Sequence, residues 1–206
     1  MERPKTIGIF AGLLTSKGKI RLQRRIEKDS IIPGKSYEGD YELPGGRVEE
    51  KDLKKALNLE TLKNELILRV EKDLGIAIRP CILPSVYLTI FEDPSKGICD
   101  WAFMVPIPPP PFYWNENAPT KRTTFDVSPQ ELYELARRPK GEQLLSGWGK
   151  RMCRMSLGAL LDSPNKEFGL QAQRYLNGIK PDWQATEHFG AFDCLLNRFH
   201  KDLGLW

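Results

Sequence analysis

The chain has 206 residues, 40% of them hydrophobic and 28% charged, which is typical of a globular protein with one full core. No run of about 18 uncharged apolar residues occurs and no signal-peptide core follows the first residues, so we expect no membrane span and a cytoplasmic location. The formal net charge of +4 is mild, and by itself it indicates neither an anionic small molecule nor nucleic acid.

The cysteines give no sign of a metal centre. Cys81, Cys99, Cys153 and Cys194 are widely spaced, form no Cys-x-x-Cys pair, and have two histidines to join them. This set does not suit a zinc site. We expect reduced, mostly buried thiols, as in other cytoplasmic proteins.

Two strands and a sharp turn are predicted in the first part of the chain. Residues 7–14 are short and apolar, and residues 20–25 alternate between apolar and polar side chains, so both are predicted strands joined by the turn chemistry of residues 16–19. A polar loop leads to Tyr41-Glu42-Leu43, after which Pro44-Gly45-Gly46 breaks the chain. The candidate site begins at this break.

A long amphipathic helix is predicted next. Residues 52–74 contain no Gly or Pro, and the helix is expected to end at Gly75. Its buried stripe consists of apolar residues at helical spacing, namely Leu59, Leu62, Leu66, Val70 and Leu74.

The middle of the chain predicts a hairpin followed by a rigid loop. Residues 85–91 and 101–107 are predicted strands on either side of the turn-rich residues 92–97. The prolines at 108–111 then favour an extended conformation, because proline has no N–H to give to a sheet. This run is expected to cross the surface.

The last part of the chain is predicted to be mainly helical. Residues 124–127 suit one more strand, and Ser128-Pro129 suits a helix start that continues to residue 138. Beyond about residue 141 the pattern predicts three further helices, over residues 144–161, 167–176 and 188–203. A basic, aromatic stretch that includes Lys150, Arg151 and Arg154 is not enough to predict a nucleic-acid surface.

The order of these features resembles the Nudix hydrolase superfamily over about residues 6 to 138. The resemblance lies in Leu43-Pro44-Gly45-Gly46-Arg47-Val48-Glu49, the long helix, and Gly75-Ile76 after it. It implies an α/β fold, a Nudix-like α/β/α sandwich with a mixed β-sheet. We expect residues 1–140 to form this domain and residues 141–206 to form a helical C-terminal extension packed on it.

The resemblance fails where the family places its metal ligands. The family signature ends in Arg-Glu, an apolar residue, any residue, Glu-Glu, any residue and Gly. When its last glycine is aligned with Gly75, Leu68 replaces the arginine, Arg69 replaces the next glutamate, and Lys72 and Asp73 replace the glutamate pair. Among the three positions that usually bind the metal, Asp73 alone keeps a carboxylate, so the Nudix box is degenerate, although Glu60 falls on the isolated first glutamate of the signature. The spacing from Gly46 to Gly75 is also longer than in the family, which implies an insertion.

Two functions remain open. The resemblance implies a pyrophosphohydrolase of nucleoside-diphosphate-linked compounds that uses Mg²⁺ or Mn²⁺. Its site residues would be Asp73 and Glu60 for catalysis, and Asp73, Glu49 and Glu50 for the metal. Alternatively, the domain binds a nucleotide or another phosphorylated small molecule without hydrolysing it, because an arginine in the place of a metal ligand can bind phosphate directly.

The candidate contacts to phosphate are the same in both hypotheses. They are Arg25, Arg47, Arg69, Gly45 and Gly46. A plainer interpretation of Arg69 is a salt-bridge ladder on the helix surface, formed with Glu65 and Asp73 at steps of four residues. Glu92 and Asp93 are a further place to which metal ligands could have moved. Many members of the family pair as dimers, so a homodimer is an expectation without a visible interface.

Overall fold

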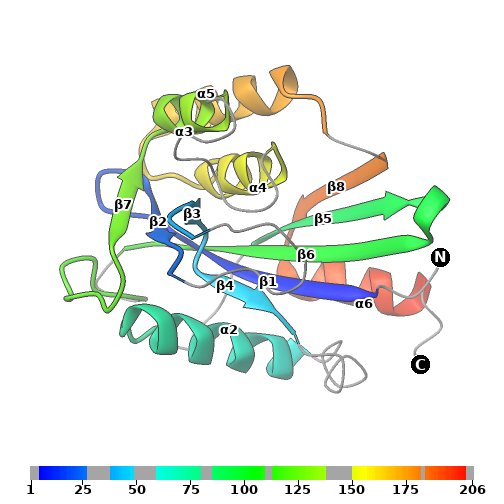
Figure 1. Ribbon diagram of the computed structural model, residues 1–206, viewed down its shortest axis with the longest axis horizontal. Coiled ribbons are helices and arrows are strands. Elements are labelled where there is room, and N and C mark those ends of the chain that lie inside the picture. Colours follow the sequence, from blue (N-terminus) through cyan, green and yellow to red (C-terminus); the bar gives the residue numbers. More distant parts are fainter. Residues whose placement is uncertain are drawn as a thin grey trace.

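Two β-sheets form the centre of the molecule in the computed structural model, which describes residues 5–26, 38–48, 59–79, 85–109, 113–137, 150–181 and 184–202. The larger sheet has the order β4-β1-β6-β5-β8 and the smaller has the order β3-β2-β7 (Figure 1). In the larger sheet β1 and β6 run parallel and the other pairs are antiparallel, so the sheet is mixed. The strands are β1 (Thr6–Leu13), β2 (Ile20–Arg24), β3 (Tyr41–Glu42), β4 (Gly45–Arg47), β5 (Val86–Asp93), β6 (Ile98–Ile107), β7 (Thr124–Val127) and β8 (Gln184–Gly190).

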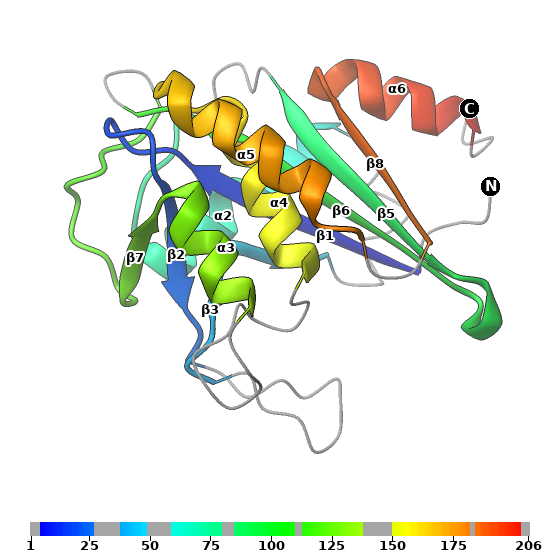
Figure 2. The same cartoon turned by 90° about the horizontal axis from the view of Figure 1, so that it is seen from above.

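Helices cover both faces of the larger sheet. On one face lie α2 (Leu59–Leu74) and α6 (Phe192–Asp202). On the other lie α3 (Pro129–Arg137), α4 (Lys150–Leu160) and α5 (Lys166–Gly178), as Figure 2 shows from above. The predicted α/β/α layering with a mixed sheet is therefore confirmed. Within the described residues no helix combines the length and apolar character that crossing a membrane requires.

The alternation of side chains along β1 explains the two layers. Ile7 and Ile9 belong to the hydrophobic cluster beneath α2 and α6, whereas Phe10 belongs to the cluster beneath α4. Successive side chains of a strand point to opposite faces, so a strand that is covered on both sides must be apolar at every position. The short apolar run of residues 7–14 meets this requirement.

Helix α2 has the predicted buried stripe and the predicted end. Leu62, Leu66, Val70 and Leu74 are at most 1% exposed. Gly75 follows with a φ of 73°, a left-handed conformation that favours glycine at a helix end. The carbonyl of Leu74 accepts a hydrogen bond from the Lys121 amide at 2.9 Å, which fixes the loop before β7 against this end. The predicted first turns, residues 52–58, lie outside the described part of the chain.

The C-terminal part contributes more than helices. Gln184–Gly190 form β8, which pairs with β5, so the helix predicted from residue 188 begins at Phe192 instead. Period-2 alternation is weak in this strand, and its pairing with β5 decides its conformation. Phe192 and Phe199 then pack on Phe103 and Trp101 at ring distances of 6.1 and 5.1 Å. The division at residue 140 stays a prediction, because residues 138–149 are not described.

Two arginines of α4 are buried rather than available to nucleic acid. The Arg151 guanidinium lies 4.2 Å from the centre of the Phe91 ring. Arg154 forms an ion pair with Glu187 on β8 and donates a hydrogen bond to the Leu176 carbonyl at 2.7 Å, near the end of α5. Hydrogen bonding to Glu187 raises the pKa of Arg154 further. Arg154 therefore joins α4, α5 and β8.

We predict that Arg154→Met lowers the free energy of unfolding by about 3 kcal/mol, because it leaves the Glu187 carboxylate buried without its cation. Urea denaturation measures the change. Arg174→Met, at an exposed position of α5, is the matched control and should have little effect. Adding Glu187→Leu to Arg154→Met should restore part of the loss. Additive losses from the two substitutions would contradict the pairing.

Candidate functional site

The Pro-Gly-Gly turn lies against the middle of β1. Gly45 has a φ of 141°, and a Cβ atom there would lie 2.2 Å from the Ile9 carbonyl oxygen, so this position requires glycine. The Pro44 carbonyl accepts a hydrogen bond from the Ala11 amide at 2.7 Å. These contacts bring β4 alongside β1 and place Gly46 opposite Ile9, on the face that α2 covers.

Arg69 reaches Gly46 from α2. A Cβ atom on Gly46 would lie 3.0 Å from the Arg69 Nη1, closer than side chains ordinarily pack. The Arg69 Nε lies 3.4 Å from the Glu65 carboxylate, and it is buried without a hydrogen bond to any described residue. The first pair of the predicted ladder is therefore present. Gly46 provides the space in which the Arg69 guanidinium lies.

Asp73 has an arginine partner that the sequence did not indicate. The Arg122 Nη2 lies 3.0 Å from the Asp73 Oδ1, and the two side chains are only 11% and 14% exposed. Arg122 belongs to the loop that the Lys121 amide attaches to the end of α2. The second pair of the predicted ladder, between Arg69 and Asp73, is replaced by this contact.

A second carboxylate that is mostly enclosed, that of Glu42 on β3, lies in the same region. It accepts hydrogen bonds from Gln23 Nε2 and Arg25 Nη1, each at 3.2 Å. Burial raises the pKa of Glu42, while the charge of Arg25 is the strongest influence that lowers it. The charges of Arg122 and Asp73 also act on this carboxyl, in opposite directions.

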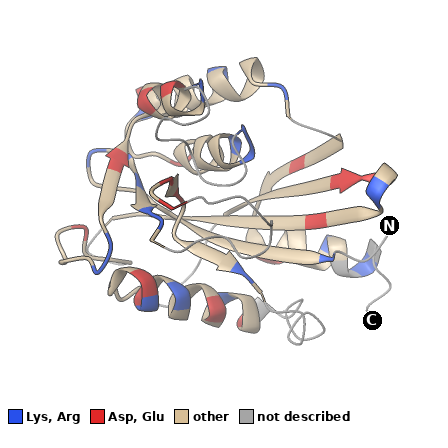
Figure 3. Ribbon diagram, viewed as in Figure 1, with Lys and Arg blue, Asp and Glu red and all other residues tan. Residues whose placement is uncertain are grey.

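These residues form one group, which we call the Glu42–Asp73 cluster. It consists of Gln23, Arg25, Glu42, Asp73 and Arg122. Its members come from β2, β3, α2 and the loop before β7. Figure 3 shows where acidic and basic residues lie along the chain, with acidic β3 beside the basic end of β2 and residues of both signs along α2.

The smaller sheet explains why polar side chains gather at this place. Gln23 lies opposite both Glu42 and Thr124 across the strands, so the three side chains share a face. On the same face the Arg21 guanidinium holds the Asp126 carboxylate with two hydrogen bonds of 2.7 and 2.8 Å. One face of this sheet is thus polar although it is largely buried.

The described residues do not suit a divalent metal ion. Three oxygen or nitrogen ligands from side chains are the usual minimum for such a site, and among the described residues no three His, Cys, Asp or Glu side chains form a group of this kind. Arg69 and Lys72 bring positive charge to α2, and Asp73 is engaged by Arg122. The proposed ligands Glu49 and Glu50 lie outside the described residues.

Two further predicted site residues lie apart from the cluster. Glu60 is in the first turn of α2 and Asp73 in the last, so the two are about 20 Å apart along the helix axis and do not share a site. Arg47 follows Gly46 in β4 and lies opposite Gly8, so strand alternation directs its side chain away from α2 and Arg69.

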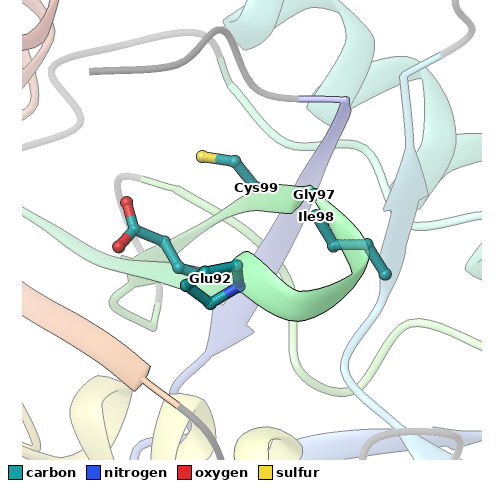
Figure 4. A pocket seen from close by; sticks show the side chains of 5 residues that line it. Glu92, Gly97, Ile98 and Cys99 are labelled. Atoms are coloured by element: carbon teal, nitrogen blue, oxygen red, sulfur yellow. The ribbon is translucent and has the colours of Figure 1, made fainter.

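The acidic residues of the β5–β6 hairpin are elsewhere. Asp93 pairs with Lys96 at 3.1 Å. Glu92 lines a hollow of about 260 Å³ together with Pro94, Gly97, Ile98 and Cys99, and its side chain and that of Cys99 lie on the same side of the hairpin (Figure 4). Strand β1 separates this hairpin from β4 and Gly46. Glu92 and Asp93 are therefore not replacement ligands near Asp73.

Comparisons with known proteins find similar structures but no similar sequences. No protein-family model and no curated protein matches the chain. Solved structures do match. The ORF135 protein of E. coli is 16% identical, with 78% of this chain and 94% of that chain covered and a TM-score of 0.48.

Two other solved structures resemble this chain to a comparable degree. The MutT protein of Methanosarcina mazei Go1 is 20% identical, with 85% of this chain and 97% of that chain covered and a TM-score of 0.45. The Nudix domain of NrtR from Shewanella oneidensis, solved with ADP ribose, is 11% identical, with coverages of 76% and 87% and a TM-score of 0.39. At such low identity a likeness concerns the fold alone. Solved structures that match the chain include proteins named as MutT and Nudix proteins, the family that the sequence resembles.

Proposed function

We propose that this chain binds a phosphorylated, nucleotide-linked small molecule beside the Gly45–Gly46 turn and does not hydrolyse it with a metal ion. The observation that carries this proposal is the ion pair between Asp73 and Arg122. Asp73 is the only carboxylate at the three usual metal-binding positions of the degenerate Nudix box, and a carboxylate held by an arginine at 3.0 Å lacks the free charge that a divalent cation needs.

Arg69 supplies the first contact to phosphate. Its guanidinium lies against Gly46, so no side chain of that residue separates it from the half-buried backbone of the turn. Its Nε has no hydrogen bond within the described part of the chain, but it is buried 3.4 Å from the Glu65 carboxylate, so a phosphate would have to replace Glu65 there. An arginine fork matches two phosphate oxygens and is less strongly hydrated than an ammonium group, which favours binding in a partly buried site.

Arg25 supplies the second contact, in exchange with Glu42. The pKa of the Glu42 carboxyl is raised by burial, and the Arg25 charge is what chiefly opposes this. A phosphate that takes Arg25 as its partner leaves Glu42 to bind a proton. The charge in the cluster is then conserved, since one anion replaces another.

Metal-dependent hydrolysis is the competing proposal. The observation in its favour is that Glu42 and Asp73 are close enough for the charge of Asp73 to raise the pKa of Glu42. Glu42 and Asp73 would then be two of the metal ligands, and Glu49 and Glu50 would have to complete the site. Mg²⁺ or Mn²⁺ bound there would polarise a diphosphate and activate water.

We predict that Arg69→Ala raises the dissociation constant of ADP-ribose at least about tenfold, because a charge-assisted hydrogen bond in a partly buried place is lost. Isothermal titration calorimetry without added metal measures it. Arg174→Ala, which removes an exposed arginine of α5, is the matched control. Equal affinities of the Arg69→Ala and Arg174→Ala proteins would exclude Arg69 from the site.

We predict that the affinity for ADP-ribose increases as the pH falls. Because the ligand draws Arg25 from Glu42, the pKa of Glu42 is higher in the complex than in the free protein, so binding takes up a proton. The affinity begins to rise as the pH falls to the pKa of Glu42 in the complex, and it stops rising once the pH is below the pKa of Glu42 in the free protein. Burial already raises this free-protein pKa above the ordinary 4.5. ADP-ribose suits this measurement, since its diphosphate stays ionised throughout.

Glu42→Gln is the control for this pH dependence. The variant has no proton to take up at this position, so its affinity for ADP-ribose should change little over the same range. A pH dependence that persists in Glu42→Gln would show that another group is responsible.

We predict no metal-dependent turnover of nucleoside triphosphates, ADP-ribose or dinucleoside polyphosphates. Phosphate release and chromatography in the presence of Mg²⁺ or Mn²⁺ test this. Hydrolysis that requires the metal and is abolished by Asp73→Asn would establish the competing proposal. Glu49→Gln and Glu50→Gln would then show whether these two glutamates complete the site.

A further inference from the structure

Arg69 has a loosely held partner in the structure. Its Nε lies 3.4 Å from the Glu65 carboxylate, whereas charge-assisted hydrogen bonds between an arginine and a carboxylate are about 2.7–2.9 Å long. The Nε is buried, and it donates no hydrogen bond to a described residue. A buried donor without a hydrogen bond lowers the stability of the folded state. The pair therefore brings two opposite charges together without satisfying the guanidinium.

Arg69 pairs with one carboxylate where the helix offers two. Glu65 and Asp73 lie four residues before and four residues after it, on the same face of α2. Asp73 is held by Arg122 at 3.0 Å, so Glu65 is the ion-pair partner that Arg69 keeps within the described part of the chain. A ligand that comes to Arg69 therefore has one internal anion to displace.

The place of the guanidinium does not depend on Glu65 alone. A Cβ atom on Gly46 would lie 3.0 Å from the Arg69 Nη1, and the three atoms nearest to it would all belong to Arg69. Gly46 lacks the positive φ of Gly45, so its backbone conformation is open to other residues. What the absent side chain of Gly46 provides is room for the guanidinium. Arg69 should therefore stay beside the turn when Glu65 leaves it.

We propose that Glu65 is the resident anion of Arg69, and that a ligand phosphate displaces it on binding. Glu65 then lowers the affinity of the site for its ligand by competing for the guanidinium. This inference rests on the proposed function, because it requires that a phosphate binds at Arg69. It gives Glu65 a part in binding that a salt-bridge ladder on the helix surface does not have.

Glu65 can leave Arg69 and keep its charge. Its side chain is 34% exposed, against 14% for that of Glu42. A carboxylate that already meets solvent can turn into water, where its charge is well solvated, whereas an enclosed one must be neutralised. The two exchanges at the site therefore differ. Displacement of Glu42 from Arg25 takes up a proton, and displacement of Glu65 from Arg69 takes up none.

Calorimetric titration with ADP-ribose at neutral pH tests the proposal. Glu65→Gln should lower the dissociation constant about two- to fivefold, because the ligand no longer has to break an ion pair of this partly exposed kind. Glu71→Gln removes the same charge from an exposed position of α2, so it is the matched control for net charge and should change the constant less. In an Arg69→Ala protein, adding Glu65→Gln should give no gain, since the guanidinium for which they compete is absent.

The results separate this proposal from the proposed function. A wild type that does not bind ADP-ribose, or an Arg69→Ala protein that binds it equally well, would overturn both. If Arg69→Ala weakens binding but Glu65→Gln binds no more tightly than Glu71→Gln, the proposed function stands and the role of Glu65 is refuted. Weaker binding by Glu65→Gln would also refute it, because Glu65 would then position Arg69 for the ligand. A gain that persists in the absence of Arg69 would do the same.

Thermal unfolding gives a second measure, which a merely structural role of Glu65 would not change. Without ligand, loss of the ion pair should leave the melting temperature of Glu65→Gln equal to that of the wild type or slightly lower. The same concentration of ADP-ribose should nevertheless raise it more in Glu65→Gln than in the wild type, because stabilisation by a ligand grows as its dissociation constant falls. An equal or smaller rise in Glu65→Gln would contradict the proposal.

Discussion

The structure depends on β1 being covered on both faces. This strand lies between β4 and β6, and the Gly45–Gly46 turn of the candidate site is placed against it. Gly45 approaches the backbone of β1 at Ile9 and Phe10, and a Cβ atom there would overlap it. On the face toward α4, a Cβ atom at Gly12 would lie 2.6 Å from that of Ala159. Glycines thus set the distance between β1 and its neighbours on either side.

Arginines hold the layers together at two places, with different consequences. Arg154 lies among α4, α5 and β8, where its ion pair with Glu187 is accompanied by hydrogen bonds to backbone carbonyls. Its donors are largely used within the protein, which suits a structural role. Around the Gly45–Gly46 turn, Arg69 has an unused donor and Arg25 has a partner whose charge can be neutralised by a proton. In the function proposed above, this second group exchanges an internal anion for an external one.

Much of the fold could be predicted because it follows from local patterns. The stripe from Leu62 to Leu74 and the end at Gly75 are visible in the sequence, and the Pro-Gly-Gly turn indicates the place of the site. Arg122 could not be found in this way. It has no motif, and its role arises from a loop that meets α2 from about 50 residues further along the chain. Glu42 was not predicted as a site residue, although it lies next to the turn. What brings it into the cluster is its pairing with Gln23 across the strands, which the sequence does not show. The strand β8 was missed for a similar reason, since only its pairing with β5 decides it.

The position of β8 has a consequence for synthesis of the protein. Leu88 of β5 pairs with His188 of β8, so these partners are separated by about a hundred residues, and β8 is followed by α6. While the chain emerges from the ribosome, β5 is an open edge and Trp101 lacks the cover that Phe199 provides. Such an edge is a template for pairing with other chains. Nascent chains, and any that stop before residue 184, are therefore the forms of this protein most exposed to aggregation.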